Sequence, residues 1–102
     1  MPNVSLGQTV SEIVQSFDQN NNPVTGATFS LDFYIDGLKT NSVVPNIQLA
    51  NASTATYSVS WSSSTVGFHQ FYLKNATTNV LYVSELYSVI TDATQPVIYV
   101  GL

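Results

Sequence analysis

The chain has 102 residues, of which 44% are hydrophobic and 8% are charged, with no cysteine and a formal net charge of −4. This composition describes one domain, residues 1–102, that can bury a single core and carries no thiol chemistry. Because Lys39 and Lys74 are its only basic side chains, the chain has too little positive charge to bind nucleic acid or an anionic membrane surface. No apolar run approaches the roughly 20 residues that span a bilayer.

Strands are expected along the first half of the chain. The clearest is residues 29–35, where Phe29, Leu31, Phe33 and Ile35 alternate with polar residues and would share the face toward the core. Residues 10–17 also fit a helical spacing, but this stretch is short and rich in β-branched residues, so we expect a strand. Shorter strands are expected at residues 4–6, 13–17, 43–44 and 47–49.

The second half predicts longer strands. Residues 57–61 alternate cleanly, and residues 66–74 place His69, Phe71 and Leu73 on one face. Residues 81–90 form another candidate, in which the apolar pattern changes face near Glu85 and indicates a bulge or a change of neighbour. A final strand is expected at residues 97–102.

Turn-forming residues separate these segments. They cluster at residues 18–23, 36–37, 51–53, 75–79 and 92–96. Their spacing of about 8 to 15 residues is typical of an all-β sandwich or barrel.

The first turn carries a partial metal-binding pattern. Asp18, Asn20 and Asn22 have the spacing of the first three oxygen ligands of a calcium loop. However, Pro23 stands where such a loop needs glycine, and Phe29 stands where a glutamate would close the site. We therefore expect a hairpin turn rich in Asn and Asp, and no metal.

His69 is the one side chain whose ordinary pKa lies near neutrality, so acid–base catalysis would have to involve it. It lies within a strand, with no carboxylate nearby in sequence and no nucleophile motif in the chain. We expect a hydrogen-bonded histidine in or beside the core. The acidic residues are scattered singly and no phosphate-binding loop is present, so we expect no catalytic residue, no cofactor and no metal site.

Three aromatic side chains are candidates for contact with a partner. Tyr34 lies on the polar face of its strand, and Phe68 and Tyr72 lie on the second face of theirs. They predict either an adhesive surface or a platform on which a sugar stacks. The alternative is that they cover sheet edges or fill the ends of the sandwich.

Two stretches carry a family resemblance. Residues 18–31, DQNNNPVTGATFSL, and residues 55–73, which include ATYSVSW and VGFHQFYL, resemble the signature of bacterial and phage immunoglobulin-like domains. Asn21 stands where that family often has a turn glycine, and His69 where it usually has a tyrosine. Asn tolerates a left-handed backbone better than other non-glycine residues, so the first difference is mild. The resemblance implies an all-β, immunoglobulin-like antiparallel β-sandwich of about seven to nine strands.

The low charge is the main indication of function. Soluble proteins average about 25% charged residues, and edge strands are usually protected by lysine, proline or inward-pointing charges. With two lysines in the chain, we expect its copies to dock against a partner through largely uncharged contacts, as homo-oligomers or lattice-bound copies. The segments before Ile13 and after Pro96 are further docking candidates, because a free terminus can add a strand to a neighbour.

An immunoglobulin-like chain that begins at its own Met without a secretory signal fits a protein made in a host cytoplasm and incorporated into a virion. We expect a non-enzymatic structural protein of a tailed phage, in the first place a capsid decoration or accessory protein that binds the major capsid protein and stabilises the shell. The alternatives are an accessory protein bound to a tail protein or fibre, and a cell-surface adhesion or carbohydrate-binding module.

Overall fold

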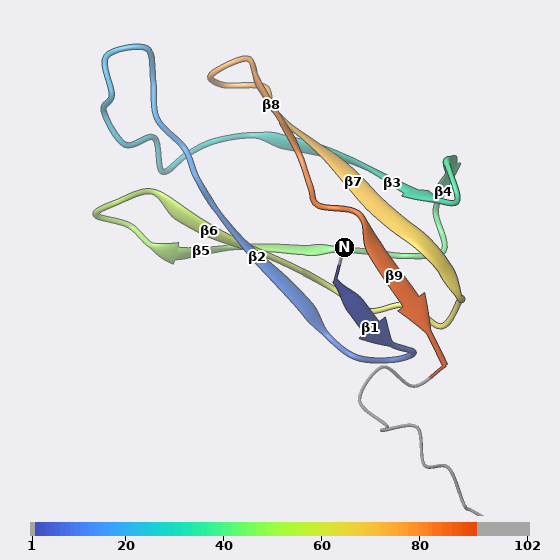
Figure 1. The fold of residues 1–102 in the computed structure, drawn as a ribbon. Helices are drawn as coiled ribbons and strands as arrows, with labels where there is room; N and C mark the ends of the chain where they lie inside the picture. The colour runs from blue at the N-terminus through green and yellow to red at the C-terminus, as the bar shows by residue number, and fades with distance from the viewer. Residues whose placement is uncertain (1, 92–102) are drawn as a thin grey trace, which may run out of the picture.

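Alternating apolar residues build two facing sheets in the computed structural model of the chain, which describes residues 2–91 (Figure 1). The strands within this range are β1 (Asn3–Ser5), β2 (Val10–Gln15), β3 (Phe29–Ile35), β4 (Leu38–Thr40), β5 (Asn46–Asn51), β6 (Thr56–Trp61), β7 (Gly67–Asn75), β8 (Val80–Val83) and β9 (Tyr87–Ile90). The final strand expected at residues 97–102 lies outside the described residues.

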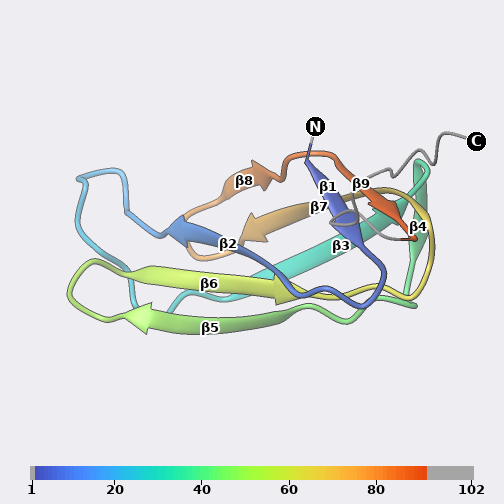
Figure 2. The same ribbon diagram turned by 60° about the horizontal axis from the view of Figure 1, so that its bottom comes forward.

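The larger sheet has six strands in the order β1-β9-β7-β3-β4, with β8 also paired to β7, and the smaller sheet has the order β2-β6-β5. The two sheets pack face to face (Figure 2), so the prediction of an all-β sandwich is confirmed. The described strands pair in antiparallel fashion with one exception. β1 and β9 run parallel, and Val4 lies opposite Val89.

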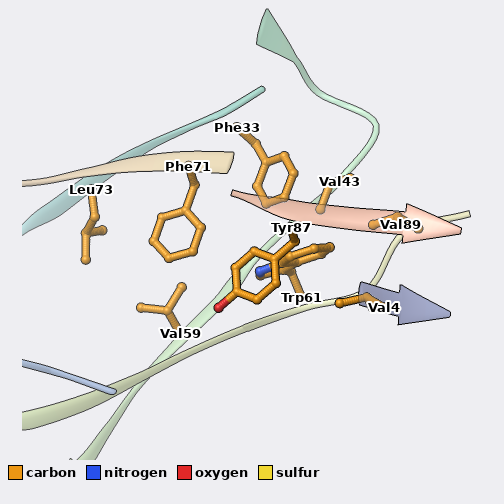
Figure 3. Packing of buried hydrophobic residues seen from close by; sticks show 9 residues of the cluster. All are labelled: Val4, Phe33, Val43, Val59, Trp61, Phe71, Leu73, Tyr87 and Val89. Atoms are coloured by element: carbon orange, nitrogen blue, oxygen red, sulfur yellow. The ribbon is translucent and has the colours of Figure 1, made fainter. Parts of the chain in front are cut away.

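The core lies between the two inner faces (Figure 3). The large sheet contributes Phe33, Phe71 and Leu73, and the small sheet contributes Val59 and Trp61. The ring of Phe33 meets that of Trp61 edge to face, with centroids 5.0 Å apart. This packing is what the alternation in the sequence predicts, because successive side chains of a strand point to opposite faces.

Two strand predictions are confirmed in detail. β3 has the predicted bounds, and its alternate residues Phe29, Leu31, Phe33 and Ile35 pack in or against the core. The segment with an ambiguous helical spacing forms β2 and pairs with β6 along its whole length. Tertiary pairing therefore decides a segment whose local pattern fits two structures.

The strand expected at residues 43–44 is wrong. Val43 reaches the core and Val44 is exposed, but both lie in an irregular segment that follows β4. The Thr40 hydroxyl accepts a hydrogen bond from the Ser42 backbone N–H at 3.1 Å, which turns the chain. Pro45 follows and has no N–H to offer a sheet. The residues after the Asp36–Gly37 turn pair instead, as the short strand β4.

The change of face expected near Glu85 is a bulge. β8 and β9 both pair with β7, and between them the three residues 84–86 face the two residues 70–71. The Ser84 hydroxyl accepts the Phe71 N–H at 2.9 Å, and the Ser84 N–H donates to the Phe71 carbonyl at 2.9 Å. β7 therefore remains the neighbour on both sides of the bulge. The extra residue is accommodated because the Ser84 hydroxyl takes the place of a backbone carbonyl as the acceptor for Phe71.

Candidate functional site

The three predicted contact residues lie on one surface of the large sheet, the side that faces away from the small sheet, which we call the outer face. Tyr34 comes from β3, and Phe68 and Tyr72 come from β7. The rings of Tyr34 and Tyr72 meet edge to face with centroids 5.1 Å apart. Phe68 lies near the start of β7, four residues before Tyr72, and is 47% exposed. The structure therefore brings two of the candidates into contact and places the third on the same face.

Two apolar residues of β8 extend the outer face. Val83 pairs directly with Tyr72, and Leu81 pairs with Lys74, so both side chains share this face with their partners. Leu81 is 61% exposed and Val83 is 45% exposed. The sequence analysis did not select them as contact residues. The sequence feature that could have identified them is the uninterrupted apolar run of β8. This run indicates a contact surface only when β8 is known to have a free edge.

Charge on the outer face is sparse. It consists of the exposed Lys74, which lies opposite Leu81, and of one ion pair. Lys39 forms an ion pair with Asp32 at 3.1 Å, and both side chains are more than half exposed. The pair lies beside the Tyr34 ring, since Lys39 is opposite Tyr34 on β4. An exposed ion pair contributes little to stability and is screened by salt. Contact through this face would therefore depend mainly on apolar surface and shape.

A cavity of about 300 Å³ lies between the sheets, where β2 and β8 approach each other. Val14, Phe29, Leu73, Val80 and Tyr82 supply apolar walls. Polar residues also line it, namely Gln15, Ser16, Asp18, Asn21, Asn75 and Thr78. Within it, the buried Asn75 amide donates a hydrogen bond across the sheets to the Ser16 hydroxyl at 2.7 Å. This bond pairs two of the polar groups in the cavity, whose exposed lining is mainly apolar.

One hydrogen bond closes the sandwich beside this cavity. The Tyr82 hydroxyl of β8 donates to the Glu12 carboxylate of β2 at 2.6 Å. Burial, followed by the bond to Glu12, raises the pKa of Tyr82 well above its ordinary value. Burial and the same carboxylate raise the pKa of Tyr87 to about 12. Both hydroxyls therefore stay protonated at neutral pH and serve as hydrogen-bond donors rather than as bases.

His69 is fully buried, as expected for a core histidine. Its Nδ1 donates to the Gly67 carbonyl at 3.0 Å, and its Nε2 accepts the Ser63 hydroxyl at 2.7 Å. The imidazole also stacks on Trp61 with centroids 5.5 Å apart. Burial lowers the pKa of His69 below its ordinary value, so the ring is neutral at pH 7. Both nitrogens are engaged and no surface of the ring is exposed, so substrate has no route to it.

The Asp18 turn is held by its own backbone. Asp18 Oδ1 accepts the N–H groups of Asn20 and Asn22 at 2.8 and 2.9 Å, and these bonds, that from Asn22 first, lower the pKa of Asp18. Asn21 adopts a left-handed backbone with φ of 63°, as expected for the residue that replaces the turn glycine. The prediction of an Asx-rich turn is confirmed.

Among residues 2–91 no three side chains of His, Cys, Asp or Glu gather as metal ligands would. In the same range no helix is long and apolar enough to span a membrane.

Comparison of the chain with protein-family models, with curated proteins and with solved structures gives no match. The function of the chain is therefore inferred from its own residues and fold.

Proposed function

We propose that the chain is a non-enzymatic structural protein that docks on a larger assembly through the outer face of its large sheet. The observation that carries this proposal is the outer face itself. Phe68, Leu81 and Val83 are exposed there beside the half-buried rings of Tyr34 and Tyr72, and its charges are Lys74 and the Lys39–Asp32 ion pair. Exposed apolar side chains gathered on one face of a chain with 8% charged residues are typical of a surface that a partner covers.

The assembly we favour is the capsid of a tailed phage, with the major capsid protein as the partner and the virion as the location. The strand order supports the resemblance to phage and bacterial immunoglobulin-like domains. In such domains the B, E and D strands share one sheet and the C, F and G strands share the other. β2-β6-β5 match the first set, and β3, β7 and β8/β9 match the second.

The absence of a catalytic role is also part of the proposal. His69 is neutral, buried and hydrogen-bonded at both nitrogens. The tyrosines with raised pKa values, Tyr82 and Tyr87, are held protonated beside Glu12. General acid–base catalysis needs a group that is accessible to substrate and titrates near the working pH, and none of these groups meets both conditions.

Stabilisation of the shell would follow from binding itself. A protein that binds the assembled lattice and not its free subunits shifts the equilibrium toward the assembled form. An array of identical docking sites also places many copies on one particle. A tail or fibre would offer the same kind of repeated surface, and attachment to a tail is the second location we consider.

The proposal is tested by sedimenting the purified chain with particles that lack it. Substituting Tyr34 and Tyr72 by Ser should weaken attachment about tenfold or more, because buried aromatic contacts dominate such interfaces. Val44→Ser is the matched control, since Val44 is 84% exposed in the segment after β4; it should bind as the native chain does. Equal binding of the double variant and the native chain would contradict the use of this face.

Ionic strength distinguishes an apolar interface from an electrostatic one. Attachment should persist between about 0.1 and 1 M salt, because the Debye length falls from about 10 to 3 Å over this range and affects only charged contacts. Loss of attachment at the higher salt concentration would contradict docking through largely uncharged contacts. Binding of isolated glycans that requires Tyr34 and Tyr72, without attachment to particles, would favour the carbohydrate-binding alternative instead.

A further inference from the structure

β8 has the least protected free edge among the described strands. Its four residues, Val-Leu-Tyr-Val, include no charge and no proline, and Val80 is 57% exposed. The other free edges are protected. β4 carries Lys39, β5 has a bulge and polar residues, β2 carries the inward Glu12, and β1 has only three residues. An exposed apolar edge of this kind is a template for another strand.

The side chains of β8 are apolar on both of its faces. On the inner side, Val80 and Tyr82 line the cavity of about 300 Å³ between the sheets. On the outer side, Leu81 and Val83 are exposed next to Tyr72 and Lys74. Side chains of an added strand would point alternately into the cavity and onto the outer face. A strand that fits this edge should therefore be apolar at every position rather than at every second one.

The chain itself contains such a segment. Residues 97–100, Val-Ile-Tyr-Val, belong to the eleven residues after Thr91 that lie outside the described range. They are β-branched or aromatic at each position, which is the composition that favours strands. They carry no charge, which suits an edge whose own side chains are apolar on both faces.

The length of the chain argues that the acceptor is another copy. The segment starts beyond Ile90, at the end of β9 furthest from β8, and β1 occupies the outer edge of β9. To pair residues 97–100 with the whole of β8 in the same molecule, Val97 would have to lie beside Val83. The seven residues from Ile90 to Val97 reach at most about 25 Å. The distance along the sheet from Ile90 back to Val83, also seven residues, is about 23 Å. The remaining length is too short for the chain to reverse its direction and pass over β1.

We propose that residues 97–100 of one copy add as a strand to the free edge of β8 in a second copy. Their alternate side chains enter the cavity between the sheets and cover Leu81 and Val83. This contact joins copies of the chain to one another. Because it covers Leu81 and Val83, docking on a particle would then use Tyr34, Phe68 and Tyr72 of the outer face. Self-association of the purified chain is measured without any particle, so the two proposals fail separately. The partner is thus a second molecule of the same protein.

Sedimentation of the purified full-length chain over a range of concentrations tests the proposal. The native chain should self-associate. Val80→Asp in the acceptor edge and Tyr99→Asp in the donor segment should each weaken self-association about tenfold or more, because each places a charge in an apolar contact. Val44→Asp is the control, since Val44 is a still more exposed valine (84% against 57% for Val80) outside β8, and this variant should associate as the native chain does. A native chain that stays monomeric throughout would overturn the proposal.

Two further measurements separate loss of contact from loss of fold. A mixture of the Val80→Asp and Tyr99→Asp chains should form a complex, since one variant keeps a native donor and the other a native acceptor. A synthetic peptide of residues 92–102 should compete with the native chain and dissociate it into monomers. The peptide requires no substitution, so failure to dissociate the assembly would overturn the proposal even if a variant were misfolded. A peptide that binds a strictly monomeric native chain would show that the segment docks in its own molecule, against the proposal.

Discussion

His69 illustrates how a single residue combines packing with a pH response. The neutral ring stacks on Trp61 and accepts the Ser63 hydroxyl at 2.7 Å in a fully buried position. Because burial lowers its pKa below 6.5 in the folded chain, the unfolded chain takes up the proton first as the pH falls. The stability that depends on the neutral ring is complete above the unfolded-state pKa and is lost as the pH falls toward the folded-state pKa.

We therefore expect the free energy of unfolding to decrease between about pH 7.5 and 5.5, by up to about 1.4 kcal/mol per pH unit once the unfolded histidine is protonated. His69→Gln should have a lower free energy of unfolding at pH 7.5 because it loses the stacking. Its free energy of unfolding should hardly change with pH over this interval, because no other side chain of the chain ordinarily titrates there. Urea unfolding at several pH values measures both. A native chain without this slope, or a variant that keeps it, would show that His69 is not the titrating group.

At the scale of elements, the bulge between β8 and β9 depends on Ser84. Its hydroxyl supplies the acceptor for the N–H of Phe71, a fully buried residue. Ser84→Ala should therefore lower the free energy of unfolding by about 1 to 3 kcal/mol, the cost of a buried donor left without a partner. Ser88→Ala, in the neighbouring strand β9, should change it by less than about 0.5 kcal/mol. Equal effects in chemical unfolding would contradict this role for the hydroxyl.

The sequence predicts most reliably those strands in which apolar and polar residues alternate at every second position. β3 and β6 follow because one of their faces is apolar and the other polar, and turn residues bound them. The parallel pairing of β1 with β9 was not predicted, because pairing between the two ends of a chain leaves no local pattern. The sequence wrongly predicts a strand at Val43, because a residue that reaches the core from a loop is as apolar as one in a strand.

For the whole molecule, the sequence identifies part of the candidate surface. Tyr34, Phe68 and Tyr72 follow from their positions on the second faces of predicted strands, and the structure places them on one outer face. Leu81 and Val80 can be identified as contact residues only from the free edge of β8 and the cavity beneath it. Both features depend on which strands become neighbours, and alternation along one strand does not encode that.

The low charge and the outer face together support our proposal that the chain works in contact with neighbouring molecules. The sandwich has two lysines to protect its edges. Its apolar surface and free edges are therefore better explained if a lattice and other copies cover them than if the chain is an isolated monomer. Docking on a virion through the outer face is what we propose first, and the contact between copies at the β8 edge, which shares Leu81 and Val83 with that face, is tested on the purified chain alone.

The most direct measurement of that claim is the copy number of the chain in particles purified from the phage lysate that contains it, determined by quantitative mass spectrometry against the major capsid protein. We expect many copies per particle, in a fixed ratio to the capsid protein across a density gradient. Absence of the chain from the particle fractions, with all of it recovered among free proteins, would contradict a role as a structural protein of the virion.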